Sequence, residues 1–98
     1  MKMKIDFTNN AGNLNVIIEG RLDTMTSPEL ENFFNTHIGD ISALTLDCGK
    51  LEYVSSAGLR VLLSAQKKFK TSMKLTNVQE LVMEVFEMTG FADILVIE

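Results

Sequence analysis

Strand and helix patterns alternate along the chain from residue 13 onward, and this order limits the folds available to it. A strand is predicted where apolar and polar residues alternate, and a helix where apolar residues recur every three or four positions. Strands linked by helices pair in parallel through right-handed crossovers, so the order βαβαβαβ indicates an α/β fold. The predicted strands lie at 13–19, 41–48, 73–76 and 94–97, and the predicted helices begin near Thr26, Ser55 and Asn77.

Another strand is predicted ahead of this series. Residues 2–7 alternate polar with apolar side chains, and Asn9–Gly12 has the composition of a tight turn, so a hairpin with the strand at 13–19 is expected. Parallel strands covered on both faces are apolar nearly throughout, whereas the early strands here alternate. We therefore expect a mixed, mostly parallel sheet with an antiparallel first strand, successive strands advancing in one direction, and the helices mainly on one face.

The clearest helix start follows a pair of serines in the segment Tyr53–Leu63. Ser55 suits the N-cap, because its hydroxyl can accept a hydrogen bond from one of the first helical N–H groups. Ser56 then lies at the mouth of the helix, where unpaired N–H donors and the positive end of the helix dipole would tolerate a phosphate. On local chemistry alone, a simple cap is the better explanation of the pair. The apolar positions that follow at helical spacing are Leu59, Leu62, Leu63, Gln66 and Phe69, with Ala65 beside them.

The other two helices carry their own boundary signals. Thr26 and Glu29 form a capping-box pattern with Pro28 in the first turn, and Asn77 and Glu80 form a similar one. Gly39 and Gly90 are expected to end these helices. The predicted apolar stripe of the last helix is Leu81, Val85 and Met88, with Val82 and Phe86 beside it.

Length and composition favour one domain over residues 1–98 in the cytoplasm. The net charge of −4 gives no electrostatic footprint for binding nucleic acid. Cys48 is the single cysteine, which excludes an internal disulfide, and its alternation with Leu44 and Leu46 predicts a small buried hydrophobe. No apolar run approaches the roughly 18 residues of a membrane span, so no membrane insertion is expected.

Catalytic and cofactor sites lack their required parts in this sequence. A serine nucleophile needs a positioned base, and the single histidine, His37, lies near the end of another helix. The Gly49–Lys50 pair is not a phosphate-binding loop, because Leu44 and Leu51 stand where that motif has glycine and Ser or Thr. No cluster of metal ligands is evident either. We therefore expect neither an enzyme nor a bound cofactor.

The serine segment resembles the signature of STAS domains in the anti-sigma-factor antagonist branch. The usual form is Asp-Ser-(Ser/Thr/Ala)-Gly-Leu, and its first serine is phosphorylated. On this match Ser56 is the phosphoacceptor, and Ala57, Gly58 and Leu59 are the following three residues. Ser55 stands where the family often has aspartate, which keeps a cap but removes a negative charge.

The resemblance extends over nearly the whole chain. Gly20–Asp23, which reads Gly-Arg-Leu-Asp, is similar to the family's Gly-x-Leu-Asp, and Met88–Phe91 resembles its closing Gly-Leu or Gly-Phe segment. The resemblance implies the STAS fold. It also implies that the Asp23 carboxylate lies near the acceptor serine and helps a kinase partner to recognise it.

The resemblance further implies a phosphorylation switch. The unmodified chain would bind a serine-kinase anti-sigma factor or a related switch kinase, phosphorylation of Ser56 would release it, and a phosphatase would reset the switch. An alternative is a STAS scaffold or transporter-associated subunit, in which the serines only cap the helix. The implied partner-binding residues are Asp23, Ser55, Ser56, Ala57, Gly58, Leu59 and Arg60.

Two residues of the serine-led helix carry further expectations. Arg60 lies one turn after Ser56, within reach of a phosphate on that side chain. Gly58 stands where a helix would favour alanine by about 0.8–1.0 kcal/mol, and close approach of a partner backbone is the expected reason. On that interpretation, Gly58→Leu would weaken partner binding and leave the melting temperature nearly unchanged.

Overall fold

The fold is a four-stranded sheet with helices packed against it, seen in a computed structural model that describes residues 3–37, 39 and 41–98. The strands are β1 (Lys4–Asn10), β2 (Asn13–Leu22), β3 (Ala43–Val54) and β4 (Met73–Thr76). The helices are α1 (Ser27–His37), α2 (Ser56–Phe69) and α3 (Glu80–Thr89), and the short 3-10 turns are η2 (Lys70–Ser72) and η3 (Phe91–Asp93).

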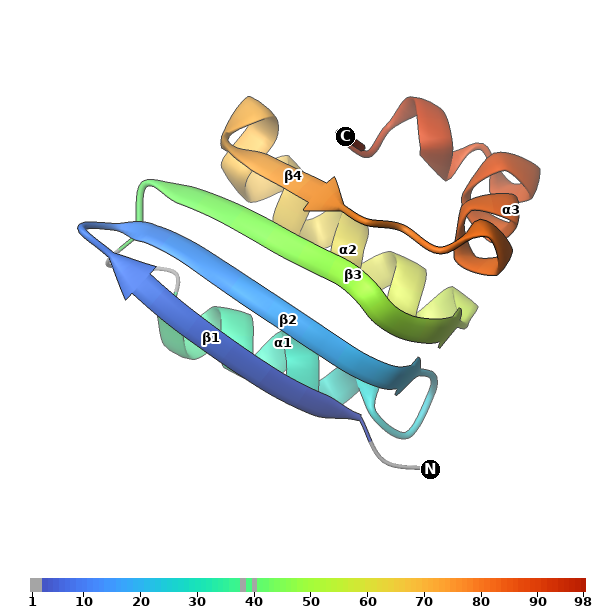
Figure 1. The fold of residues 1–98 in the computed structure, drawn as a ribbon, viewed down its shortest axis with the longest axis horizontal. Helices are drawn as coiled ribbons and strands as arrows, with labels where there is room; N and C mark the ends of the chain where they lie inside the picture. The colour runs from blue at the N-terminus through green and yellow to red at the C-terminus, as the bar shows by residue number, and fades with distance from the viewer. Residues whose placement is uncertain (1–2, 38, 40) are drawn as a thin grey trace.

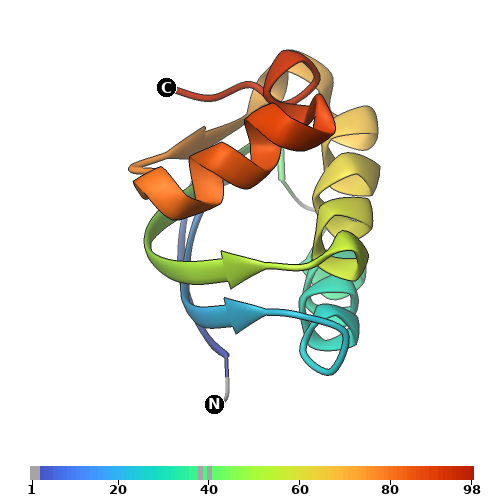
Figure 2. The same ribbon diagram turned by 90° about the vertical axis from the view of Figure 1, so that its right-hand side faces the viewer.

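The strands lie in chain order across the sheet, β1-β2-β3-β4 (Figure 1). β1 runs antiparallel to β2, whereas β2, β3 and β4 are parallel to one another. Helices α1 and α2 cover one face, and in the described part of the chain no helix covers the opposite face (Figure 2). The predicted order, direction and one-sided cover are therefore confirmed.

A tight turn joins β1 to β2 at Ala11 and Gly12, whose φ angles are 54° and 91°. Two-residue hairpin turns of the primed types need positive φ, which glycine adopts without strain. Asn10 pairs with Asn13 directly across this turn. The first strand thus continues three residues beyond the predicted 2–7 range, because pairing runs up to the turn.

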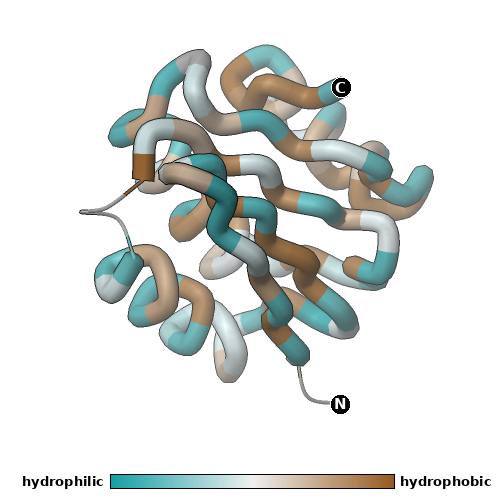
Figure 3. The backbone as a smooth tube through the Cα atoms, turned by 60° about the vertical axis from the view of Figure 1, so that its left-hand side comes forward, coloured by the Kyte–Doolittle hydropathy of each residue, from teal (hydrophilic) through white to brown (hydrophobic). Residues whose placement is uncertain are grey.

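The core lies between the sheet and helices α1 and α2. Apolar and polar residues alternate along the strands (Figure 3), and the inward positions are fully buried. Cys48 is one of them, as predicted, and burial raises the pKa of its thiol to about 12. The thiol therefore stays protonated and unreactive at neutral pH. The inward residues of the two central strands include Leu14, Val16, Ile18, Leu44, Leu46 and Cys48.

The predicted buried stripe of α3 is wrong by one position. Val82 and Phe86 face the core, whereas Leu81 and Met88 are 68% and 86% exposed. Both sets have helical spacing, so periodicity alone does not choose between them. The choice is made by packing, since α3 lies against β3 and η3 on the β4 side of the sheet.

The predicted last strand at 94–97 is also wrong. Residues 91–93 form η3, and a single parallel bridge joins Ile97 to Leu75 of β4. The bridge consists of the Leu75 N–H donating to the Val96 carbonyl at 2.8 Å and the Glu98 N–H donating to the Leu75 carbonyl at 2.9 Å. The direction was predicted correctly, but η3 leaves too little extended chain for a strand.

Neither predicted capping box forms. The Thr26 hydroxyl donates to the Arg21 carbonyl at 2.7 Å and does not reach into α1. Asn77 has a φ of 56°, and its side-chain amide donates to the Asp47 carboxylate at 3.1 Å. Gln79 is the N-cap of α3, without a side-chain cap bond. Gly90, with a φ of 81°, ends α3 as predicted.

Among the described residues, no helix is long and apolar enough to cross a membrane.

Candidate functional site: the carboxyl ends of β2 and β3

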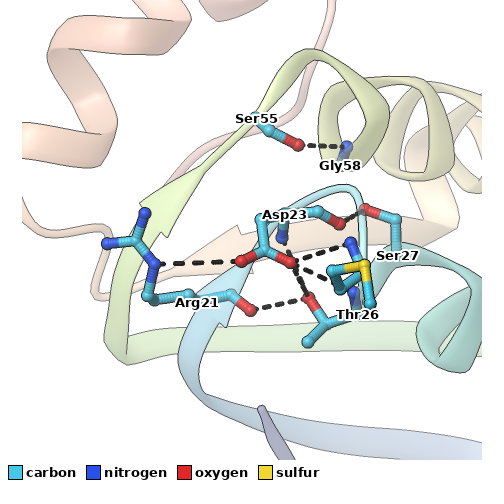
Figure 4. Close-up of polar contacts among 7 residues, drawn as sticks. Arg21, Asp23, Thr26, Ser27, Ser55 and Gly58 are labelled. Atoms are coloured by element: carbon cyan, nitrogen blue, oxygen red, sulfur yellow. Dashed lines mark hydrogen bonds and ion pairs between the residues drawn. The ribbon is translucent and has the colours of Figure 1, made fainter. Parts of the chain in front are cut away.

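Two loops meet where the central parallel strands end. The first is the 22–26 loop after β2, and the second is the serine loop, residues 54–56, after β3. Leu22 and Val54 are paired in register, and the Ser55 N–H donates to the Leu22 carbonyl at 2.9 Å. Loops that follow adjacent parallel strands share one edge of the sheet, which is where α/β folds commonly place their sites. The sheet therefore brings the loop that carries Asp23 beside the serine loop, and Figure 4 shows Asp23 and Ser55 on these two loops.

Ser55 caps α2, as predicted. Its backbone is extended, with φ −96° and ψ 174°, and its hydroxyl oxygen accepts from the Gly58 N–H at 3.3 Å. Ser56 is the first residue of α2, and it is exposed to solvent. The two serines therefore have different roles, because Ser55 caps the helix whereas Ser56 is accessible to solvent.

Gly58 packs inside the protein, which corrects the expected reason for this glycine. A Cβ atom at this position would lie 2.7 Å from Cγ of Leu22 and 2.8 Å from its carbonyl oxygen. Real Cβ atoms do not approach a backbone oxygen so closely. The close partner is the end of β2, and the glycine allows α2 to dock against it.

The other motif residues divide between core and surface. Leu59 is only 4% exposed and belongs to the core, so its side chain is not available to a partner. Ala57 is half-buried and Arg60 is exposed. Both line a shallow pocket of about 230 Å³ between α1 and α2, together with Thr24, Ser27, Pro28, Glu31 and Val61.

Asp23 is held rigidly within its own loop. One carboxylate oxygen accepts from the backbone N–H groups of Met25 at 3.0 Å and Thr26 at 3.1 Å, while the other lies 3.8 Å from Nε of Arg21. The hydrogen bond from the Thr26 N–H is the main cause that lowers the pKa of the Asp23 carboxyl. The group is therefore ionised at neutral pH and is oriented by its own loop.

Sequence patterns missed one contact at this edge. The guanidinium of Arg21 lies over the Tyr53 ring, 4.1 Å from its centroid, and the two residues are paired between β2 and β3. The pairing depends on register shifts between these strands, at Ile17/Glu19 and Gly20/Arg21. The residue pattern does not reveal such shifts in strand register, so the Arg21–Tyr53 contact could not be predicted from the sequence.

The family model for the STAS domain matches residues 4–98. The chain belongs to the STAS domain family. A relative of this chain, the protein BtrV of Bordetella bronchiseptica, is 31% identical over 96 residues, which cover 94% of this chain and 83% of BtrV. The anti-sigma-B factor antagonist of Bacillus subtilis is 28% identical over 98 residues, covering 97% of this chain and 90% of that protein.

A solved structure shares the fold of this STAS domain. SpoIIAA in its unphosphorylated form has a TM-score of 0.80 at 16% identity, and the match covers 97% of this chain and 88% of that one. SpoIIAA has also been solved in its phosphorylated form. At this level of identity the likeness establishes the fold alone.

His37 stands apart from the STAS site. It ends α1, whereas the 22–26 loop precedes that helix, and its ring stacks on Phe33 with centroids 4.3 Å apart. In the described part of the chain, no group of three or more His, Cys, Asp or Glu residues is placed to hold a metal ion. The site therefore combines an exposed serine at the N-terminus of α2 with a fixed carboxylate on the adjoining 22–26 loop.

Proposed function

We propose that this STAS domain is an anti-sigma factor antagonist in a partner-switching pathway. Unphosphorylated, it binds a serine-kinase anti-sigma factor or a related switch kinase, and phosphorylation of Ser56 releases that partner. The observation that carries the proposal is the position of Ser56, exposed at the first residue of α2 and beside the loop that fixes Asp23. The Bacillus relative, an anti-sigma-B factor antagonist that is 28% identical to this chain, supports the same assignment.

A phosphate on Ser56 fits the free protein better than it fits an interface. It adds about −1.5 to −2 charge, which the N-terminus of α2 can accommodate. The first turn of α2 contains no acidic residue to repel it. In a packed interface the same phosphate loses its water and faces the partner's groups. Each 1.4 kcal/mol of this difference weakens binding about tenfold.

The kinase activity and its ATP belong to the partner, and a phosphatase removes the phosphate. Asp23, Ser56, Ala57 and Arg60 offer groups that a partner can contact, whereas Ser55, Gly58 and Leu59 hold the serine loop in place. The motif residues therefore have two roles: some contact the partner, and the others fix the conformation of the serine loop. No chemical step is carried out by the antagonist itself.

A constitutive STAS scaffold is the second candidate. Two observations favour it. The hydroxyl of Ser55 is engaged as the cap of α2, and the aspartate that often precedes the acceptor serine in the family is missing. In that case the partner binds whatever the state of Ser56.

Variants at Ser56 separate these two functions. We expect Ser56→Ala to bind the kinase as the wild type does and to remain unphosphorylated, because Ser55 still caps α2. Ser56→Asp is expected to bind at least tenfold more weakly, since a charge is placed in the interface. Calorimetry measures the affinities, and mass spectrometry after incubation with kinase and ATP locates the phosphate. Ser64→Asp is the control, because it adds the same charge to an exposed position of α2 two turns later.

Equal affinity for wild type, Ser56→Ala, Ser56→Asp and phosphorylated protein would eliminate the switch and favour the scaffold. A phosphate found on Ser55 in place of Ser56 would contradict the assignment of the acceptor.

Arg60 is expected to hold the phosphate of the modified protein. It lies on the turn that follows Ser56 and is exposed, and guanidinium groups form strong, charge-assisted contacts with phosphate. Such a contact favours the dianion, so the second pKa of the phosphoserine should be lower in the wild type than in Arg60→Ala. Phosphorus NMR titration of the purified phosphoprotein measures this difference. Lys68→Ala, at the far end of α2, should titrate like the wild type, and identical curves for all three proteins would rule out the contact.

A further inference from the structure

The outer face of α3 is a surface that the proposed function does not use. Leu81 and Met88, the exposed residues of the predicted stripe, lie on this same face about two helical turns apart. Glu80, Glu84 and Glu87 are exposed beside them. We call this the α3 surface. Lys74 is the last basic residue of the sequence, so nothing after it offsets these glutamates.

A second surface has the opposite charge and the same apolar character. An apolar pocket of about 310 Å³ lies where the end of α2 meets the C-terminal segment. Ile94, which is 50% exposed, and Val96 supply apolar groups, and Lys67 and Lys70 supply positive charge. We call this the lysine pocket. Among the described residues, none of the four ion pairs includes its lysines or the glutamates of α3.

The lysine pocket is already held in shape. The side chain of Gln66, which lines it, is only 6% exposed and spans from α2 to the C-terminal segment. Its amide nitrogen donates to the carbonyls of Lys70 at 2.5 Å and Met73 at 3.1 Å, and its oxygen accepts from the Val96 N–H at 3.1 Å. A surface fixed in this way loses little conformational freedom when a partner binds.

We propose that the α3 surface of one chain docks in the lysine pocket of a second copy. The apolar residues of each surface cover those of the other, and the glutamates meet the lysines. Both surfaces lie on the β4 side of the sheet (Figure 1), so two copies can exchange them reciprocally in a closed two-fold dimer. Lys67 is roughly 16 Å along α2 from Ser56 at 1.5 Å per residue, so the lysine pocket and Ser56 lie at opposite ends of α2.

Charge reversal with rescue tests this dimer. Sedimentation velocity of the wild type should show concentration-dependent dimers that weaken at high salt, because surface charges are screened. Glu84→Lys and Lys67→Glu should each weaken dimerisation at least tenfold. An equimolar mixture of the two should form dimers again, since the reversed α3 surface of one variant then meets the reversed pocket of the other. Glu52→Lys, an exposed change on β3, is the matched control and should dimerise like the wild type.

Three outcomes would overturn the proposal. They are a wild type that stays monomeric up to about 1 mM, charge-reversed variants that dimerise like the wild type, and a mixture that fails to recover. Met88→Gln gives a test independent of charge and should also weaken the dimer. Kinase binding and phosphorylation of Ser56 do not enter these measurements, so failure here leaves the proposed function standing.

Discussion

Gly58→Ala is expected to lower the free energy of unfolding by about 2–3 kcal/mol, because the added methyl group overpacks a fixed contact. For a domain of this size the melting temperature should fall by roughly 10–20 °C. The new Cβ atom would stand 2.8 Å from the carbonyl oxygen of Leu22 and 2.7 Å from its Cγ. That carbonyl already accepts the Ser55 N–H at 2.9 Å, so it cannot move without disturbing the serine loop.

Chemical denaturation measures this loss, and two variants control it. At Gly39 an added Cβ meets nothing within 4 Å, so Gly39→Ala should change stability by less than about 0.5 kcal/mol. Leu22→Ala removes one of the two clashes. The double variant Leu22→Ala/Gly58→Ala should therefore lose less stability than the sum of the single variants. If the stability of Gly58→Ala were unchanged, internal packing would not explain the glycine, and close approach of a partner backbone would again be the better explanation.

The Gly58 contact shows how one glycine connects fold and site. It lets α2 approach the end of β2, and this approach brings the serine loop to the loop that carries Asp23. The sequence marked Gly58 as unusual in a helix, yet it gave no means of choosing between an external and an internal neighbour. The identity of that neighbour depends on the crossing of two elements 36 residues apart, counted from Leu22 to Gly58.

Local chemistry was predictable wherever residues close in sequence decide the structure. Ser55 caps α2 through an N–H three residues away, Gly90 ends α3 in the left-handed region, and Ala11 and Gly12 form the hairpin turn. The order and direction of the strands also followed, because right-handed crossovers leave few ways to connect alternating strands and helices.

Prediction failed where a side chain that suits a helix cap bonds to a loop or a strand instead. Thr26 had the pattern of a cap, but its hydroxyl donates to the Arg21 carbonyl and accepts from the Asp23 N–H. Asn77 likewise turns to the Asp47 carboxylate on β3. Side chains of Thr, Ser, Asn and Asp serve helix ends and loops about equally well, so the tertiary setting decides between these uses.

Gln66 is a further case, since its helical spacing placed it in an apolar stripe whereas the structure gives its amide a polar role. We expect Gln66→Leu to lower the free energy of unfolding by about 2–3 kcal/mol, because leucine fills similar space but leaves buried backbone groups without partners. The groups that lose this partner are the Val96 N–H and the Met73 carbonyl, whereas the Lys70 carbonyl still accepts from the Met73 N–H.

The loss at Gln66 should begin in the C-terminal segment. The Leu75 N–H donates to the Val96 carbonyl, and the Glu98 N–H donates to the Leu75 carbonyl, so both depend on the position that Gln66 gives to Val96. Hydrogen exchange in Gln66→Leu should therefore accelerate at these two amides more than in the centre of β2.

Gln79→Leu is the matched control, because it removes one exposed hydrogen bond, to the Gly49 carbonyl, and should change stability by less than about 1 kcal/mol. Unchanged protection at Leu75 and Glu98 would show that η3 and the Leu75–Ile97 bridge hold the segment without the glutamine. If protection is lost as expected, the same variant should also weaken the dimer, because the lysine pocket loses the segment that supplies Ile94 and Val96.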